Sequence, residues 1–331
     1  MVTPPWCLLD SQVDLLGKDY LCHTYRLPGP VTMVESSLVE YLPAMPARTA
    51  ILYMHGYTDY FFQGDLGPFF AKLGLGFFAL DLQGYGRSIR PNTPPNWCDS
   101  LSQYHMDIRM ALAHMRSAGI EEVVILAHST GGLIASSYLA KQYDMDAANE
   151  QIPYPAIRGL ILNSPFLALP FSPKLQLHMT RLIWWVVSAL PFHQLRADKI
   201  STYARTIHRR FRGEWDYRLD WKPAHGFPLS FHWLKQIIFS QRDLLKQRIP
   251  LPTLMCHSKR STLRQHSVEA VRQGDGVLDV ESMKGAAGMI FQNLTQAEID
   301  GGFHDLYLSP EPIRERYLST IERWLNQQIL L

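Results

Sequence analysis

The sequence of 331 residues predicts an α/β fold, with a mostly parallel central sheet whose two faces are covered by helices. Two observations support this prediction. Short apolar runs rich in β-branched residues alternate with longer runs of helical periodicity over residues 36–165 and again over 252–329. Between these regions, residues 166–247 are rich in aromatic residues and show no clear strand. We therefore expect one sheet interrupted by a helical lid over the carboxyl ends of its strands.

The first part of the core is expected over residues 1–165. Strands are assigned to apolar runs between turn residues, and helices to segments of helical periodicity. Ser100 or Ser102 is expected to cap the second helix, and Pro43–Pro46 to form a turn. In chain order the predicted elements are a strand at Ser36–Leu42, a strand at Thr49–Met54, a helix at Leu66–Leu73, a strand at Gly76–Leu80, a helix at Leu101–Ala118, a strand that starts at Val123, a helix at Gly131–Tyr143 and a strand at Ile157–Leu162.

The lid is expected over residues 166–247, and the second part of the core over residues 248–331. In that second part, the predicted strands are Pro252–Cys256 and Phe291–Ile299, and the predicted closing helix is Pro312–Ile329. The return of strand and helix alternation places these elements in the same sheet as those of the first part.

One run of the lid, Leu182–Phe192, is apolar on nearly all sides if it is helical. It is shorter than the ~18 to 20 apolar residues that cross a bilayer. Three interpretations remain open: packing of the lid on the core, a pocket for an acyl chain, or peripheral contact with a membrane.

Composition excludes several classes of function. A net charge of +2 gives no basis for nucleic-acid binding. The four cysteines are scattered without metal-ligand spacing, so we expect neither a disulfide framework nor a zinc site, and Cys256 is expected to be a buried thiol. We expect no cofactor. The sequence begins without the pattern of a secretory signal, so a cytoplasmic protein is expected.

The most informative stretch is Val123–Ala135, where an apolar strand stops at Ser129 and a helical pattern follows at once. This order is typical of a nucleophile elbow, in which a tight turn exposes the serine. The residues two positions away must be small, and Ala127 and Gly131 satisfy this requirement. Ala127 stands where glycine is usual, and we expect its methyl group to be tolerated.

A reactive serine needs a base, and the base needs a carboxylate that fixes its tautomer. His304 follows the last predicted strand in a loop with neighbouring glycines, so it is the candidate base. Asp275 is the leading candidate for the acid, with Asp279 and Glu281 as competitors. Asp279 is better placed to begin the next helix, where a carboxylate is favourable.

The oxyanion formed during acyl transfer requires two backbone N–H donors. Tyr57 follows the Thr49–Met54 strand, after His55 and Gly56, and Thr130 opens the helix after Ser129. We predict that the N–H groups of Tyr57 and Thr130 form this pair. His55 is interpreted as a structural member of the turn.

Taken together, these motifs resemble the α/β-hydrolase superfamily over residues 34–165 and 250–328. The motifs are His55-Gly56, Asp81–Ser88, the serine elbow and His304-Asp305, in that order. The set is similar to the monoacylglycerol lipase and lysophospholipase branch, also described as serine aminopeptidase-like hydrolases. Within that branch, the resemblance implies nucleophile Ser129, acid Asp275 and base His304, whereas Asp81, Gly84 and Gly86 match a structural loop. One departure is the segment Ser258–Gln273, which is longer than is typical.

The resemblance and the apolar lid favour a serine esterase or lipase that acts on a small-molecule ester with an acyl chain. A peptidase or amidase is an alternative, for which Glu214 and Asp216 could recognise a free amino group. A non-catalytic ligand-binding protein on the same fold is a second alternative. The residues do not indicate the head group, the acyl length or the oligomeric state.

Overall fold

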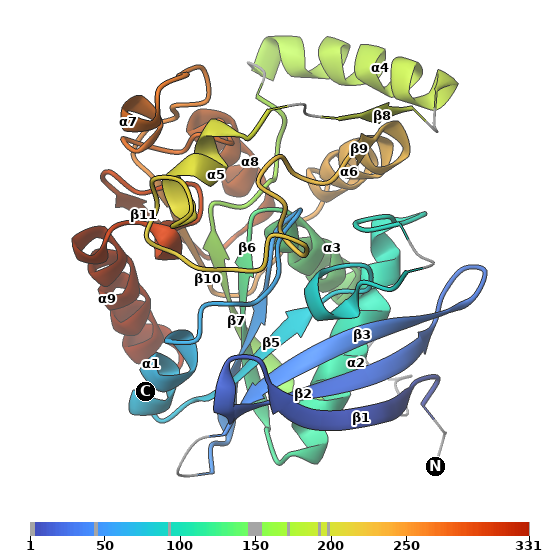
Figure 1. Cartoon of the computed structure of the whole chain (residues 1–331), viewed down its shortest axis with the longest axis vertical. Helices are drawn as coiled ribbons and strands as arrows, with labels where there is room; N and C mark the ends of the chain where they lie inside the picture. Colours follow the sequence, from blue (N-terminus) through green and yellow to red (C-terminus); the bar gives the residue numbers. More distant parts are fainter. Residues whose placement is uncertain are drawn as a thin grey trace.

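A computed structural model describes residues 4–42, 46–91, 94–144, 154–170, 173–190, 193–196 and 199–330. Most of the predicted Pro43–Pro46 turn, and the end of the Leu182–Phe192 run, lie outside these ranges. A nine-stranded sheet forms the centre of the molecule, with strand order β1-β2-β3-β5-β4-β6-β7-β10-β11 (Figure 1). The predicted parallel arrangement is confirmed from β5 to β11, and β1, β2 and β3 pair antiparallel to their neighbours.

The predicted core strands are all present, with ends that differ from the predictions by a few residues. Two N-terminal strands, β1 and β2, were not predicted. The strands of the main sheet are β1 Cys7–Asp14, β2 Gly17–Pro28, β3 Met33–Tyr41, β4 Thr49–Met54, β5 Gly76–Asp81, β6 Glu122–His128, β7 Ala156–Asn163, β10 Thr253–Ser258 and β11 Leu294–Ile299.

The helices also follow the predicted order, and Ser100 caps the short η2 turn that precedes α2. Their bounds are α1 Leu66–Lys72, η1 Gly86–Ser88, η2 Leu101–Gln103, α2 Tyr104–Ser117, α3 Thr130–Asp144, α4 Pro173–Ala189, α5 Thr202–Ile207, α6 Phe231–Leu244, α7 Val268–Val271, α8 Val280–Ile290, η4 Leu306–Leu308 and α9 Glu311–Gln328.

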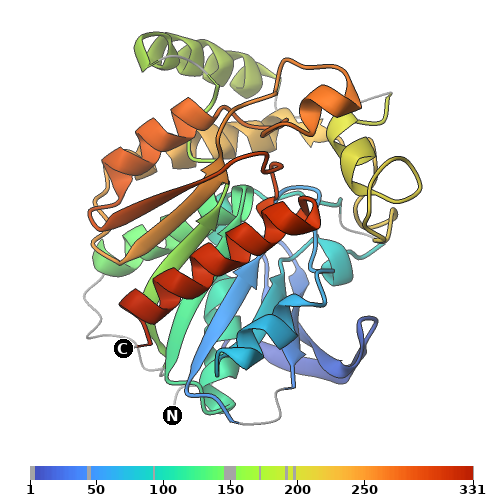
Figure 2. The ribbon, with the colours of Figure 1, turned by 90° about the vertical axis from the view of Figure 1, so that its left-hand side faces the viewer.

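Helices cover both faces of the sheet because its central strands are buried on both sides. One apolar cluster joins the sheet to α2, α3, α6 and α8, and a second joins the other face to α1 and α9. Figure 2 shows α9 lying across its face of the sheet. The carboxyl ends of the parallel strands therefore open toward the region that residues 166–247 occupy.

The insertion after β7 contains the helices α4, α5 and α6, and it also contains a short two-stranded sheet of β8 Gln194–Leu195 and β9 Leu229–Ser230. The expectation that this region holds no strand was wrong in that detail. In both views α4 lies at the end of the molecule opposite the β1–β2 hairpin (Figures 1 and 2). Within the described residues, none of the helices is sufficiently long and apolar to span a bilayer.

Candidate active site

Ser129 lies in the turn between β6 and α3, as the sequence predicts. Its backbone has φ +51°, a left-handed conformation that is strained for a residue with a side chain. The turn leaves no space for a side chain at Gly131, where an added Cβ would lie 2.4 Å from the carbonyl oxygen of His55. Ala127 is fully buried in the sheet, so its methyl group packs in the core. The elbow therefore forms with alanine at the first small position.

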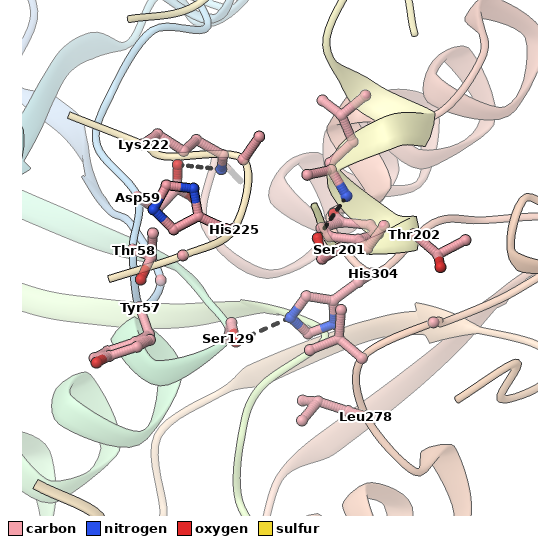
Figure 3. A pocket seen from close by; sticks show the side chains of 18 of the residues that line it. Tyr57, Thr58, Asp59, Ser129, Ser201, Thr202, Lys222, His225, Leu278 and His304 are labelled. Atoms are coloured by element: carbon pink, nitrogen blue, oxygen red, sulfur yellow. Dashed lines mark hydrogen bonds and ion pairs between the residues drawn. The ribbon is translucent and has the colours of Figure 1, made fainter. Parts of the chain in front are cut away.

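His304 reaches Ser129 from the loop after β11. Gly301 in that loop has φ +73°, and the chain turns there toward the carboxyl ends of the strands. The Nε2 atom of His304 lies 2.9 Å from the Oγ atom of Ser129 (Figure 3). The Nδ1 atom of His304 lies 2.9 Å from Oδ2 of Asp275. A carboxylate only accepts, so Nδ1 carries the proton and Nε2 is free to accept the hydroxyl proton of Ser129. The structure thus brings all three predicted side chains together.

Asp275 is held by the loop between β10 and α8. Its Oδ1 atom accepts hydrogen bonds from the N–H groups of Val277 and Leu278, each at 2.8 Å, and its side chain is fully buried. The competitor Asp279 begins the next helix, as the sequence analysis expects: its carboxylate caps α8 by accepting a hydrogen bond from the N–H of Ser282 at 2.9 Å. The longer Ser258–Gln273 segment does not displace the acid from His304.

Two aromatic rings that the sequence analysis did not assign to the site contact His304. The ring of His128 lies 4.8 Å from that of His304, and Tyr203 meets His304 edge-on at 5.8 Å. Burial lowers the pKa of His128, which favours an uncharged ring beside the candidate base. The carboxylate of Asp305 is turned to Asn163 Nδ2 at 2.7 Å and to the N–H of Tyr307 at 3.0 Å. The His-Asp pair at 304–305 is visible in the sequence, but these contacts depend on the tertiary fold.

Asp59, His128 and Asp305 lie close enough to share a cation. Their charges already have protein partners, because Lys222 binds Asp59 and Asn163 binds Asp305. Burial raises the pKa of Asp59, but the ammonium of Lys222 together with His128 and His55 outweighs this effect, and the pKa lies below its usual value. Asp59 is therefore an ion-paired carboxylate.

The predicted oxyanion donors flank Ser129. Thr130 is the first residue of α3, where a helix leaves its N–H groups without an intrahelical acceptor. On the other side, a Cβ added to Gly56 would lie 3.1 Å from Cβ of Ser129, so the loop after β4 contacts the serine. The N–H of Tyr57, in this loop, has no acceptor among the described residues. His55 is structural, since Nδ1 bonds the carbonyl of Gly56 at 2.8 Å and Nε2 accepts from the N–H of Leu82 at 3.2 Å.

Residues 57–60 are here called the oxyanion loop, after the role predicted for Tyr57. Each of the four forms a hydrogen bond or an ion pair with the segment 218–228 of the insertion. Three of these contacts are hydrogen bonds with backbone groups of the segment 218–228, and the fourth is the ion pair of Lys222 with Asp59 (Figure 3). The pairs are Tyr57 Oη to Pro228 O at 3.2 Å, Phe227 N to Thr58 Oγ1 at 3.4 Å, Lys222 Nζ to Asp59 Oδ1, and Arg218 N to Tyr60 Oη at 2.8 Å.

A cavity of about 840 Å³ opens above Ser129 and His304, between the core and the insertion. Its apolar lining includes Phe166, Ile207, Leu229, Trp233, Val277 and Leu278. Among the described residues that line it, Asp59 carries the only carboxylate. Glu214 and Asp216 are not in this lining, and they pair with Arg272 and Arg209.

The family described as serine aminopeptidase, S33 matches residues 45–310, which is most of the chain. The chain belongs to this family. Its membership confirms the resemblance to serine aminopeptidase-like hydrolases that the motifs indicate. A comparison with curated proteins found no match.

Solved structures show the same fold. A soluble variant of monoglyceride lipase from Saccharomyces cerevisiae, in complex with a substrate analogue, has a TM-score of 0.63 and 16% identity, over 91% of this chain and 99% of that one. Monoacylglycerol lipase from Paleococcus ferrophilus has a TM-score of 0.59 and 19% identity, over 89% of this chain and 99% of that one. Est1E from Butyrivibrio proteoclasticus, with ferulic acid bound, has a TM-score of 0.54 and 14% identity, over 90% of this chain and 97% of that one. This S33 family member is therefore an α/β-hydrolase in fold.

Proposed function

We propose that this S33 family member is a serine esterase that cleaves carboxylic esters with an acyl chain. The observation that carries the proposal is the continuous relay from Ser129 Oγ through His304 to Asp275, with both links at 2.9 Å. A serine hydroxyl becomes a nucleophile when a positioned base accepts its proton. The left-handed turn at Ser129 supports this role, because it presents the hydroxyl to the cavity.

In the proposed reaction, Ser129 Oγ attacks the ester carbonyl carbon while His304 Nε2 takes the hydroxyl proton. Asp275 stabilises the resulting imidazolium through Nδ1–H. The N–H groups of Tyr57 and Thr130 are proposed to bind the oxyanion of the tetrahedral intermediate. His304 then gives the proton to the leaving alkoxide, which departs as an alcohol. Water, activated by His304 in the same way, hydrolyses the acyl-enzyme.

The lining of the cavity supports an acyl substrate. Recognition of a free amino terminus needs an unpaired anionic group, and the carboxylate of Asp59 is neutralised by Lys222. Glu214 and Asp216, the residues considered for that role, pair with arginines outside the lining. The apolar walls suit an alkyl or aryl acyl group, because burying about 25 Å² of apolar surface contributes roughly 0.6 kcal/mol. The monoglyceride lipase and the monoacylglycerol lipase of the same fold support this proposal.

We further propose that the insertion, residues 166–247, is a lid whose α4 contacts a lipid surface. Trp185 is 70% exposed, and Leu182, Val186 and Leu190 are also exposed on or just after this helix. Soluble proteins rarely leave such an apolar face unpartnered. A lipid surface would supply an acyl substrate at the end of the molecule where the cavity is covered.

The test is a series of p-nitrophenyl esters and monoacylglycerols of graded acyl length, compared with aminoacyl arylamides. We expect turnover of the acyl esters to exceed that of the arylamides. A fluorophosphonate should add its mass to Ser129 in the parent and leave Ser129→Ala unlabelled. Faster cleavage of the arylamides would favour the peptidase alternative. Ligand binding without turnover or labelling would favour a non-catalytic protein.

A further inference from the structure

A cluster of two histidines and a glutamate lies apart from the cavity, between the N-terminal strands and α2. His23 is on β2, Glu40 on β3, and His114 near the end of α2. In the antiparallel register, Leu21 opposes Glu40 and His23 opposes Leu38, so His23 and Glu40 are diagonal neighbours on one face of the sheet. The helix α2 packs on that face and brings in His114. None of the three residues lines the cavity above Ser129.

Both imidazoles direct the same nitrogen at one carboxylate oxygen. The Nε2 atom of His23 lies 3.0 Å from Oε2 of Glu40, and that of His114 lies 3.7 Å from the same oxygen. The two rings are 4.4 Å apart between centroids. The three ligand atoms all lie within 4.8 Å of one another.

The opposite nitrogen of each ring is held by a hydroxyl group. Ser11 Oγ is 2.8 Å from Nδ1 of His23, and Tyr25 Oη is 2.7 Å from Nδ1 of His114. Metal-binding histidines have this arrangement, in which the outer nitrogen bonds a polar group that fixes the ring orientation. A hydroxyl can accept a hydrogen bond from Nδ1–H, which leaves Nε2 with a free lone pair. The hydroxyls of Ser11 and Tyr25 therefore suit a metal-bound state.

The distances fit a tetrahedral metal ion. Ligand atoms bound at about 2.0 to 2.1 Å lie about 3.3 Å apart in that geometry. The Oε2 atom of Glu40 lies 3.0 Å from Nε2 of His23 and 3.7 Å from Nε2 of His114, so the two distances fall on either side of this value. The side chains of His23, Glu40 and His114 are 8%, 19% and 13% exposed, so an ion can enter and keep a water molecule as its fourth ligand.

We propose that His23, Glu40 and His114 form a binding site for a divalent transition-metal ion such as Zn²⁺. Two imidazoles and one carboxylate favour such an ion over Mg²⁺ or Ca²⁺, which take oxygen ligands. The ion would link β2 and β3 to α2, and so fasten the N-terminal hairpin to the core. Since the cluster is separate from Ser129, the site is structural rather than catalytic.

The experiment measures Zn²⁺ binding to the full chain after treatment with EDTA, by calorimetry and by thermal unfolding. We expect one equivalent to bind, and the melting temperature to rise by about 4 °C when free Zn²⁺ is about 100 times Kd. Co²⁺ should give the intense visible absorption of a four-coordinate ion. His23→Gln and His114→Gln should each remove the strong site and the absorption. His178→Gln, which changes an exposed histidine on α4, is the matched control and should bind as the parent does.

A second variant keeps the proposal testable if a ligand variant does not fold. Tyr25→Phe retains all three ligands but removes the hydroxyl that holds Nδ1 of His114, so its affinity should fall about 10-fold. Circular dichroism in EDTA verifies the fold of each variant. Absence of a Zn²⁺ effect on the folded parent would overturn the proposal. So would a thermal shift of equal size in the His23→Gln/His114→Gln double variant.

Discussion

The core and the insertion hold their functional side chains in opposite ways. In the core, Ser129, Asp275 and His304 are buried and linked by short hydrogen bonds to one another and to backbone N–H groups. The insertion leaves Trp185 largely exposed on α4, yet it fastens its segment 218–228 to every residue of the oxyanion loop. The proposed catalytic groups are thus fixed in the core, while the insertion both contacts the loop 57–60 beside Ser129 and carries an exposed apolar face.

The largest effect is expected for the nucleophile itself. Ser129→Ala should lower kcat for acyl esters by about 10⁴- to 10⁶-fold, because the other triad groups cannot act without it. Ser136→Ala is the matched control: this buried hydroxyl on α3 bonds the carbonyl of Gly132 and does not line the cavity. Steady-state hydrolysis of a p-nitrophenyl ester measures both. Equal loss in the two variants would indicate that the fold of α3 matters rather than the hydroxyl of residue 129.

The next prediction compares the effects of substituting Asp275 and Asp279 on kcat. Asp275→Asn should lower kcat by about 10⁴-fold, because the amide can donate and so favours the wrong tautomer of His304. Asp279→Asn should change kcat less than about twofold, since asparagine caps a helix as well as aspartate does. The same assay and a melting curve check the pair. The reverse order of effects would identify Asp279 as the acid.

Lys222→Met tests the ion pair by which the insertion holds Asp59 of the oxyanion loop. Loss of the ion pair leaves Asp59 buried without a partner, which should cost about 3 to 5 kcal/mol of stability. A small displacement of the Tyr57 N–H should also lower kcat by about 10- to 100-fold with little change in KM. Lys222→Arg keeps the ion pair and should recover most of kcat. If KM alone changed, Lys222 would act on substrate binding and not on the loop.

The pH dependence of this variant has a definite sign. Burial raises the pKa of Asp59, but Lys222, His128 and His55 together lower it below the ordinary value of 3.8. The ion pair therefore contributes stability above pH 3.8, and that contribution is lost as the pH falls through the lowered folded-state pKa. In Lys222→Met the buried carboxyl group loses its main cationic partner, so its pKa should rise; the destabilisation should be greatest near neutral pH and should begin to shrink above pH 3.8, where Asp59 of the folded variant takes up a proton. Denaturant unfolding of parent and variant at several pH values measures the difference.

The smallest effect on soluble substrates is expected at α4. Trp185→Ser should weaken binding to lipid vesicles several-fold and leave hydrolysis of a short soluble ester within about twofold, because the side chain is exposed away from Ser129. Val13→Ser is the matched control, since Val13 is 60% exposed on β1 at the opposite end of the molecule. Vesicle flotation checks both variants. Equal binding by the parent and Trp185→Ser would remove the lipid-contact proposal.

Local patterns were sufficient to predict most of the core and the triad side chains. The elbow could be identified because the strand, the serine and Gly131 are adjacent in the sequence, and the cap at Asp279 follows from its place before α8. The strand β1 escaped prediction because its side chains are exposed except at Asp14, so it shows no buried alternation. It forms by antiparallel pairing along β2, which involves residues that no local window compares.

Contacts between residues far apart in the sequence could not be predicted for a related reason. Lys222 and Asp59 are 163 residues apart, and Asn163 and Asp305 are 142 apart. The first pairing depends on how the insertion folds back over the sheet, and the second on the order of β7, β10 and β11 in the sheet; nothing in either local sequence specifies the partner. The same holds for the approach of His114 to His23 and Glu40, which requires α2 to pack on the N-terminal strands.

The helix α6 has a consequence for engineering chimaeras of this family. It contacts α4 on one side and α3 on the other, and its Trp233 and Ile237 belong to the cluster that covers the sheet. It is the last helix of the insertion and leads the chain back to β10, as a crossover between parallel strands requires. A graft that exchanges insertions between relatives should therefore replace sequence only up to residue 230 and retain the host's α6.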